Sequence, residues 1–364
     1  MRRILRNIPL PFWCYFLPMM ARTFGLLPDA SSFYEEMVRM LLPGALILLL
    51  LSANLSSLLK IGKVSLATMC VGSLGIVLGG VGSFFLFRHF LPEKAWMGLG
   101  TLAGSWIGGS INMAALKEAI GTPSELFSPM IFVDSLVAYS WMGFLLFLAP
   151  YQTRFDRWNH SRKEWLEAAD KILKDFPFQK KVSSITFKNA LLLLGIAFLG
   201  TCFSLWLSQR LPPWKGGVTP QTWLVLVATT SALLLSLTPL SRLETLGASR
   251  LGGFLLYLML LSMGAQADLK ELLHFPLFVL VGIVWVCIHG GILFLAGRAF
   301  KIPLFFLATA SQANVGGVVS APIVASCYES RLAPLGLLLA IVGNLTGTYL
   351  GLLTAYLMRL VSTL

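Results

Sequence analysis

Apolar runs of 20 residues or more recur along this 364-residue chain, and they limit its fold more than any other feature. A helix needs about 20 apolar residues to cross the hydrocarbon core of a bilayer, whereas a strand of a membrane barrel alternates apolar and polar residues over about ten positions. Only 12% of the residues are charged, against about 25% in soluble domains. We therefore predict an all-α polytopic membrane protein.

The apolar runs fall into two halves, residues 1–150 and 188–364, which we predict to be two related transmembrane repeats. The basic stretch 151–187 between them has apolar residues at helical spacing. It is predicted to be a cytoplasmic amphipathic helix on the membrane surface or a plain linker. The predicted spans, about 11 in number, are 8–26, 34–55, 64–88, 95–120, 126–149, 188–209, 221–240, 250–268, 275–299, 303–327 and 333–360.

Two of these spans carry a double glycine in the middle of the apolar run. Gly108-Gly109 precedes Gly316-Gly317 by 208 residues, and on that alignment Thr101 corresponds to Thr309. Paired interrupted spans are the best sequence pointer to the binding site of a transporter. Unwound backbone at membrane depth must face protein or a water-filled cavity, because its polar groups cannot be satisfied by lipid.

Neutral hydrogen-bonding side chains flank both double glycines, a chemistry suited to a small solute or to Na⁺. The alternative interpretation is close helix packing, which needs the glycines but not the neighbouring amides. We predict a substrate-binding site made of residues from both segments: Ser105, Gly108, Gly109, Ser110, Asn112, Gln312, Asn314, Gly316, Gly317 and Ser320.

Asp134 lies in the middle of the predicted span 126–149. A carboxylate at that depth costs at least about 2.5 kcal/mol, so an intramembrane acidic residue is a functional-site hypothesis by default. We predict that Asp134 couples transport to Na⁺ or H⁺, with Asn344 as its uncharged counterpart in the second half. A structural hydrogen-bonded pair inside the bundle is the alternative.

Weak echoes between the halves occur in the same order, since the turn with Asn54 resembles the turn with Asp268 and the two double glycines resemble each other. They predict a duplicated unit. Counting the spans leaves the repeat orientation open. The repeats are parallel if every span crosses, and the parity changes if the first segment is re-entrant.

Several classes of protein are disfavoured. The net charge of +12 comes from basic residues spread through short loops and helix ends, which fits lipid headgroups and not nucleic acid. The five cysteines and four histidines are scattered and form no metal-binding or disulfide pattern, so we expect no cofactor. His289 stands alone in its span, and we therefore expect no enzyme.

The Gly-Ser-Trp-Ile-Gly-Gly run that starts at Gly104 resembles the YjcL-like domain-of-unknown-function family (number eight-one-nine) of integral membrane proteins. The resemblance covers nearly the full length. Other stretches that carry it are Pro11–Pro18, Met40-Leu-Leu-Pro-Gly, Gly75-Ile-Val-Leu-Gly-Gly, Asp134-Ser-Leu-Val and Ser311-Gln-Ala-Asn-Val-Gly-Gly.

That family is grouped with the cation–proton antiporters and anion transporters, whose fold has two inverted repeats and two crossed, broken helices. The resemblance therefore implies secondary transport, with the two glycine-broken segments as the crossing pair. Family members carry one more N-terminal span, which would pair with span 188–209. Asn54 stands where an acidic residue is common in the family, which leaves a role for that position open.

We predict a secondary active transporter of a small organic solute (an organic anion, amino acid or peptide fragment), coupled to Na⁺ or H⁺ by alternating access. The alternatives are a cation–proton antiporter and a non-transporting membrane scaffold or partner subunit. The expected partners are the lipid bilayer and the solute, with a homodimer left open. The expected location is a bacterial inner (plasma) membrane or a chloroplast membrane.

Overall fold

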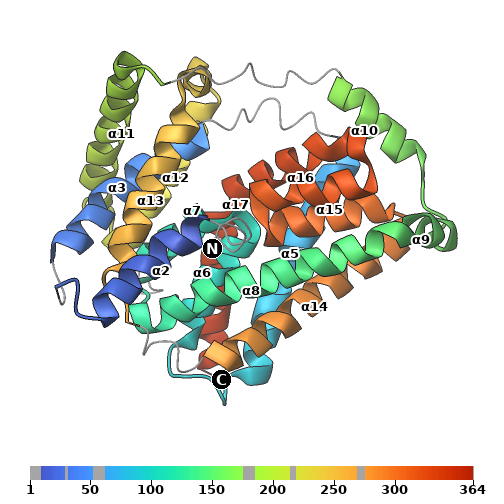
Figure 1. Cartoon of the computed structure of the whole chain (residues 1–364), viewed down its shortest axis with the longest axis horizontal. Helices are drawn as coiled ribbons and strands as arrows, with labels where there is room; N and C mark the ends of the chain where they lie inside the picture. The colour runs from blue at the N-terminus through green and yellow to red at the C-terminus, as the bar shows by residue number, and fades with distance from the viewer. Residues whose placement is uncertain are drawn as a thin grey trace. The chain divides into compact units, whose positions relative to one another are not determined.

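The structure, a computed structural model, describes residues 10–28, 32–51, 62–174, 185–213, 219–268 and 275–363. These residues form helices and connecting turns and no strand. Figure 1 shows the helices, which are α2 (Leu10–Thr23), α3 (Ser32–Leu51), α5 (Lys63–Phe87), α6 (Ala95–Gly108), α7 (Ser110–Ile120), α8 (Ser124–Leu148), η1 (Ala149–Tyr151), α9 (Gln152–Asn159), α10 (Glu164–Lys174), α11 (Phe187–Ser208), α12 (Pro220–Ser236), η2 (Pro239–Leu246), α13 (Ala248–Gly264), α14 (Phe275–Phe300), α15 (Leu304–Val315), α16 (Gly317–Tyr328), η4 (Ser330–Leu332) and α17 (Ala333–Ser362).

Each predicted span coincides with one helix or with one interrupted pair, α6–α7 and α15–α16. By length and composition, five helical stretches of the described residues can cross a membrane, or six if α12 and η2, which meet at 96°, count as one. Most of the other apolar helices are shorter, whereas α3 has 20 residues but carries Glu35, Glu36 and Arg39. The structure is therefore that of a polytopic helical membrane protein, while eleven crossings and the repeats remain predictions. Residues 1–7 and the turn containing Asn54 lie outside the described residues.

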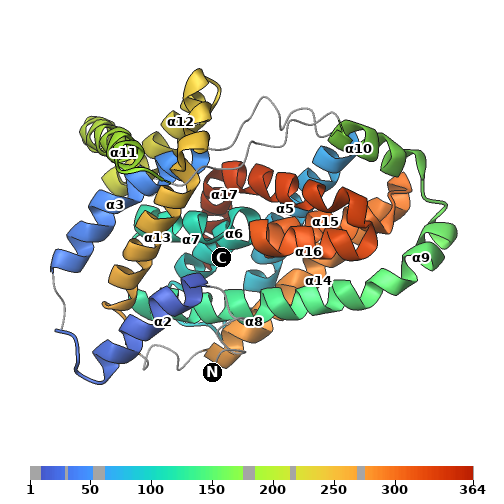
Figure 2. The same cartoon turned by 45° about the horizontal axis from the view of Figure 1, so that its top comes forward.

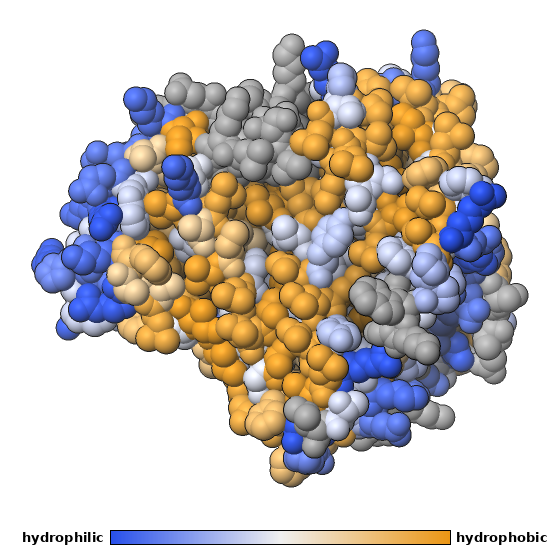
Figure 3. Space-filling view, turned by 180° about the vertical axis from the view of Figure 1, so that it is seen from behind, coloured by the Kyte–Doolittle hydropathy of each residue, from blue (hydrophilic) through white to orange (hydrophobic). Residues whose placement is uncertain are grey.

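Apolar side chains cover much of the face drawn in Figure 3. Many large ones are exposed, among them Phe187, Phe198 and Leu199 on α11. Water would oppose this exposure, since monomeric soluble proteins rarely show contiguous apolar patches larger than a few hundred Å². The exposed apolar surface is the one that a lipid-embedded protein needs.

The chain folds into two compact units, and each takes segments from both halves of the sequence. Unit 1 comprises residues 1–55, 114–135 and 178–275, and unit 2 comprises residues 56–113, 136–177 and 276–364. The predicted boundaries 1–150, 151–187 and 188–364 divide the chain into sequence repeats and a linker, not into compact units. The repeats remain a prediction.

In unit 1, α3 packs against α11, α12 and α13, and α13 also packs against α2 (Figures 1 and 2). The α3 side chains Leu46, Ile47 and Leu48 are almost completely buried. Small residues permit close approach: a Cβ added at Gly264 on α13 would overlap the backbone carbonyl of Tyr15 on α2. Apolar helices in lipid associate largely through such packing.

In unit 2, α17 packs along α6, α16, α5 and α15 (Figure 2). The glycine-rich face of α5 accepts side chains from α14. A Cβ added at Gly79 would lie 2.9 Å from Trp285 Cδ1, and the Trp285 indole donates a hydrogen bond to the Ile76 carbonyl at 2.7 Å. The glycines of α5 thus allow α14 to approach closely.

The polar stretch after α8 forms two helices, α9 and α10, which belong to unit 2. On α10, Leu166, Ala169 and Leu173 are buried, so protein covers at least part of the predicted amphipathic face. Asn159 on α9 donates to the carbonyls of Gly297 and Ile302 at 3.2 and 3.1 Å, and thus holds the turn between α14 and α15.

Asp156 on α9 caps the second interrupted helix from outside it. Its Oδ1 accepts a hydrogen bond from the Leu304 backbone N–H at 2.9 Å, whereas the residue before that helix, Pro303, has no capping side chain. A carboxylate here also faces the positive end of the helix dipole.

We expect Asp156→Ala to lower stability by about 1 kcal/mol, the usual cost of losing a capping oxygen. Asp156→Asn keeps an acceptor and is expected to cost less. The control is Glu36→Ala, which removes an exposed pair with Arg39 and should change stability by less than about 1 kcal/mol. Thermal unfolding of the purified variants measures both, and equal unfolding midpoints for Asp156→Ala and wild type would refute the capping role.

Candidate functional site

The predicted substrate-binding residues all lie in unit 2, and so does Asn344. They surround two interruptions, which we call the first break (Gly108-Gly109, between α6 and α7) and the second break (Gly316-Gly317, between α15 and α16). Asp134 lies in unit 1, half-buried, in the middle of α8.

Glycine is required at the first break for two reasons. Gly109 has a φ of 76°, in the region that side chains disfavour. A Cβ on Gly108 would lie 2.8 Å from the Gly343 carbonyl oxygen and would also overlap the Asn112 amide. Ser105 is buried, and its backbone carbonyl accepts the Gly109 N–H at 2.7 Å, which closes the last turn of α6. Ser110 begins α7 and is half-buried.

Side-chain amides satisfy the backbone group that the first break frees. Asn112 Nδ2 donates to the Gly108 carbonyl at 2.6 Å and to the Asn344 carbonyl at 3.1 Å, and Asn112 Oδ1 accepts from the Thr348 hydroxyl at 2.5 Å. With its amide nitrogen turned toward α6, Asn344 also donates to the Gly108 carbonyl at 2.7 Å. The first break is thus a closed joint between α6, α7 and α17.

Asn344 therefore contacts the first break, a role that the sequence did not suggest. The sequence paired Asn344 with Asp134, which the structure assigns to the other unit. Thr348, one turn beyond Asn344, was not predicted at all. The available signal was the i, i+4 spacing, which puts both polar residues on one face of α17.

The second break is built differently. Gly317 has a φ of 67°, and a Cβ added there would meet nothing within 4 Å. A Cβ on Gly316 would overlap the side chains of Gln312 and Ser320, which meet over it through a 2.8 Å hydrogen bond from Gln312 Nε2 to Ser320 Oγ. This bond bridges the two half-helices.

Asn314, also predicted as a binding residue, is engaged by the protein itself. Its Oδ1 accepts from the Ser73 hydroxyl on α5 at 2.9 Å, and its Nδ2 donates to the Ala310 carbonyl at 3.0 Å. It ties α15 to α5. By contrast, Gln312 Oε1 and Thr309 Oγ1 are buried and have no hydrogen-bond partner in the described structure.

A buried chain of hydrogen bonds connects α8, α15, α14 and α5, and no sequence pattern indicates it. Trp141 on α8 donates from Nε1 to Ser311 Oγ at 2.8 Å, and Ser311 Oγ lies 2.9 Å from His289 Nε2. His289 Nδ1 lies 3.0 Å from the Gly72 carbonyl. Because a carbonyl only accepts, Nδ1 must carry the proton, and Nε2 of the neutral ring then accepts from the Ser311 hydroxyl. The chain fixes the orientation of Ser311, the neighbour of Gln312.

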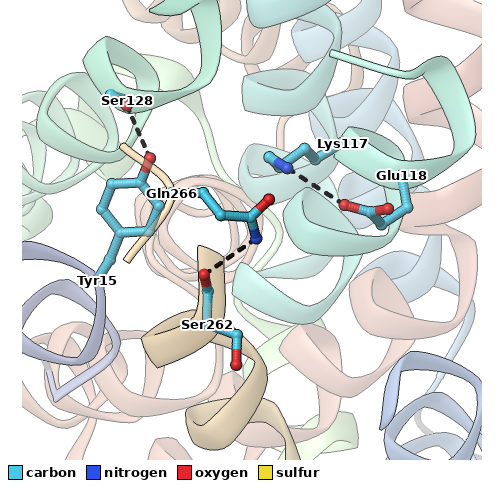
Figure 4. A network of polar contacts seen from close by, with 6 residues as sticks. All are labelled: Tyr15, Lys117, Glu118, Ser128, Ser262 and Gln266. Carbon is cyan, nitrogen blue, oxygen red and sulfur yellow. Dashed lines mark hydrogen bonds and ion pairs between the residues drawn. The ribbon is translucent and has the colours of Figure 1, made fainter. Parts of the chain in front are cut away.

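Unit 1 has a polar cluster of its own, drawn in Figure 4. Ser128 donates to the Ser124 carbonyl at 2.8 Å, so the Tyr15 hydroxyl, 2.7 Å away, donates to Ser128 Oγ. Lys117 Nζ lies 3.3 Å from Glu118 Oε1 in the last turns of α7. The Lys117–Glu118 pair could have been noticed in the sequence, because the two charged residues lie inside an otherwise apolar segment.

Comparison with known proteins agrees with this description. Residues 2–361 match the model of the family described as "Protein of unknown function (DUF819)". The chain is also 28% identical over 339 residues to the "Uncharacterized membrane protein YjcL" of Bacillus subtilis (strain 168), which covers 90% of this chain and 85% of that protein. Because the family model spans almost the whole sequence, the chain belongs to the DUF819 family.

Proposed function

We propose that this protein is a secondary active transporter of a small organic solute, coupled to Na⁺ or H⁺ and working by alternating access. One observation carries the proposal: unit 2 holds two glycine-interrupted helices whose breaks are surrounded by buried polar side chains. Interrupted helices with free dipole ends and backbone groups are the usual construction of substrate and ion sites in transporters.

Helix packing alone accounts for the first break but not for the second. At the first break, α17 fits closely because Gly343 and Gly347 lie against α6. At the second break, the position of a Gly317 side chain is open, and Gln312 Oε1, one turn before the glycine pair, is buried without a hydrogen-bond partner in the described structure. A ligand site is the simpler account of an interruption that has both features.

Asp134 remains our candidate for the coupling carboxylate. It is the last but one residue of unit 1 on α8, and the same helix continues into unit 2 from Leu136. A group whose charge changes at that point of the chain would affect both units. We expect Asp134→Asn to abolish the ion dependence of uptake while leaving the protein folded. Unchanged uptake with unchanged ion dependence would exclude this role.

The solute class we propose is an organic anion, amino acid or peptide fragment. The half-helix α16 directs its N-terminal dipole to the second break, which favours the negative group of such a solute. A bacterial plasma membrane is the location we favour, since the similar membrane protein is from Bacillus subtilis.

The experiment has two steps. A solute panel is first screened for compounds that raise the thermal stability of the purified protein, because a ligand stabilises the state that binds it. Compounds that do so are then tested for uptake into proteoliposomes under an imposed Na⁺ or pH gradient. We expect at least one solute to accumulate above the level in protein-free liposomes. Movement of a cation with no solute would indicate an antiporter, and no flux under either gradient would favour a scaffold.

A further inference from the structure

The two broken helices differ at positions that the sequence alignment makes equivalent. Thr101 on α6 and Thr309 on α15 stand at the same distance before their glycine pairs, and both are completely buried. The Thr101 hydroxyl donates to the Gly98 carbonyl at 2.7 Å. The Thr309 hydroxyl has no hydrogen-bond partner in the described structure.

Gln312 adds a second unpartnered oxygen on the same face of α15. Its Nε2 is committed to Ser320 Oγ, which leaves Oε1 without a donor although the residue is only 1% exposed. Flipping the amide would not remove the problem, because its nitrogen, with two N–H groups, would then occupy the position that has no partner. Residues three apart on a helix are neighbours, with about 5–6 Å between their Cβ atoms.

Buried polar atoms are nearly always paired, so two unpaired oxygens on neighbouring residues call for an explanation. An amide oxygen only accepts, and it therefore takes either a hydrogen-bond donor or a cation. Gln312 lies in the last turn of α15, where the helix dipole presents its negative end, and Thr309 lies one turn before it. The position thus favours positive charge.

The surroundings also restrict the size and charge of the ion. Thr309 is 0% and Gln312 1% exposed, so a ligand of these two oxygens has to be small and dehydrated, which excludes an organic molecule. The two oxygens are neutral, whereas Ca²⁺ and Mg²⁺ are bound through carboxylates. A small monovalent cation is the ligand that matches these oxygens.

We propose that α15 holds a Na⁺ site with Thr309 Oγ1 and Gln312 Oε1 as its side-chain ligands. At the first break, in contrast, the Gly108 carbonyl and Asn112 Oδ1 already accept hydrogen bonds from protein groups. As a coupling site, this assignment rests on the proposed transport function and makes Na⁺ the coupling ion. As a binding site, it does not depend on transport and can be tested in the absence of a solute.

The test is the thermal unfolding midpoint of the full chain, purified in detergent, as NaCl replaces choline chloride at constant ionic strength. We expect the midpoint to rise with Na⁺ by about 2 °C or more and to level off at saturation. KCl is expected to give a smaller rise. The expected variant result is loss of the Na⁺-dependent rise in both Thr309→Val and Gln312→Leu.

The matched control is Thr101→Val, the same substitution at the equivalent position of α6, which should keep the full Na⁺-dependent rise. Without Na⁺, Thr309→Val should unfold at or above the wild-type temperature, because it removes an unpaired hydroxyl. Thr101→Val loses a hydrogen bond and should unfold lower. If Thr309 had a structural role instead, Thr309→Val would unfold below the wild-type temperature.

Three results would overturn the assignment. In the first, Thr309→Val keeps the Na⁺-dependent rise in unfolding midpoint. In the second, Thr101→Val loses that rise as completely as Thr309→Val does. In the third, the wild-type midpoints in NaCl and choline chloride are identical, which would mean that water alone fills the position. A clear Na⁺-dependent rise without solute uptake would contradict the transport function only. Uptake driven by a pH gradient in a protein that does not respond to Na⁺ would contradict the Na⁺ site only.

Discussion

Gly343→Ala is expected to destabilise the protein by about 3 kcal/mol, toward the upper end of what overpacking costs. Gly343 lies on α17 where that helix crosses the end of α6, and an added methyl group would overlap the Ile107 carbonyl oxygen. It would also lie 3.0 Å from the methyl carbon of Met69. A methionine can move aside, but a carbonyl in the last turn of a helix cannot, so α17 would have to separate from α6.

The control is Gly291→Ala on α14, also in unit 2, where an added Cβ meets nothing within 4 Å. Alanine is the better helix former by about 1 kcal/mol, so this variant should unfold at or above the wild-type temperature. Thermal unfolding and size-exclusion profiles of both variants make the comparison. Equal midpoints for Gly343→Ala and Gly291→Ala would contradict the close contact at the first break.

Asn112→Leu is expected to cost about 2–4 kcal/mol, because each buried polar group left unpaired costs about 1–3 kcal/mol. Asn112 is completely buried and bonds to the Gly108 carbonyl, the Asn344 carbonyl and the Thr348 hydroxyl. Part of the loss is recovered, since the Gly108 carbonyl keeps the Asn344 amide as a donor.

A double variant tests the network directly. Thr348→Val removes the hydroxyl that Asn112→Leu would strand, so the two substitutions together should cost at least about 0.5 kcal/mol less than the sum of the single variants. Strict additivity of the unfolding free energies would show that the two side chains do not interact. Ser110→Ala, two residues before Asn112 and half-buried at the start of α7, should change stability by less than about 0.5 kcal/mol.

The helices and their interruptions could be predicted from the sequence because their causes are local. Apolar runs long enough to span a bilayer form helices, and the double glycines at Gly108-Gly109 and Gly316-Gly317 coincide with the ends of α6 and α15. The number of membrane crossings, in contrast, is not determined by local sequence. Several apolar segments form helices too short to span a membrane alone, such as the 14 residues of α2, and their crossing depends on packing that periodicity does not report.

The candidate site was predicted in outline but not in its division of roles. Sequence alone treats the two breaks as equivalent, since each has a double glycine with polar neighbours. Their difference comes from contacts between residues far apart in the chain: Asn344 is 232 residues from Asn112, and Ser73 is 241 residues from Asn314. His289 was set aside as isolated in its span, although its partners come from α5 and α15.

The measurement that tests Na⁺-coupled transport most directly is solute uptake into proteoliposomes driven by an inward Na⁺ gradient, with wild type, Gln312→Leu and Thr101→Val compared side by side. We predict that wild type and Thr101→Val accumulate solute above equilibrium and that a Na⁺ ionophore abolishes the accumulation. Gln312→Leu is expected to insert and fold but not to accumulate solute. Equal accumulation by Gln312→Leu, or accumulation that is indifferent to the Na⁺ gradient, would contradict it.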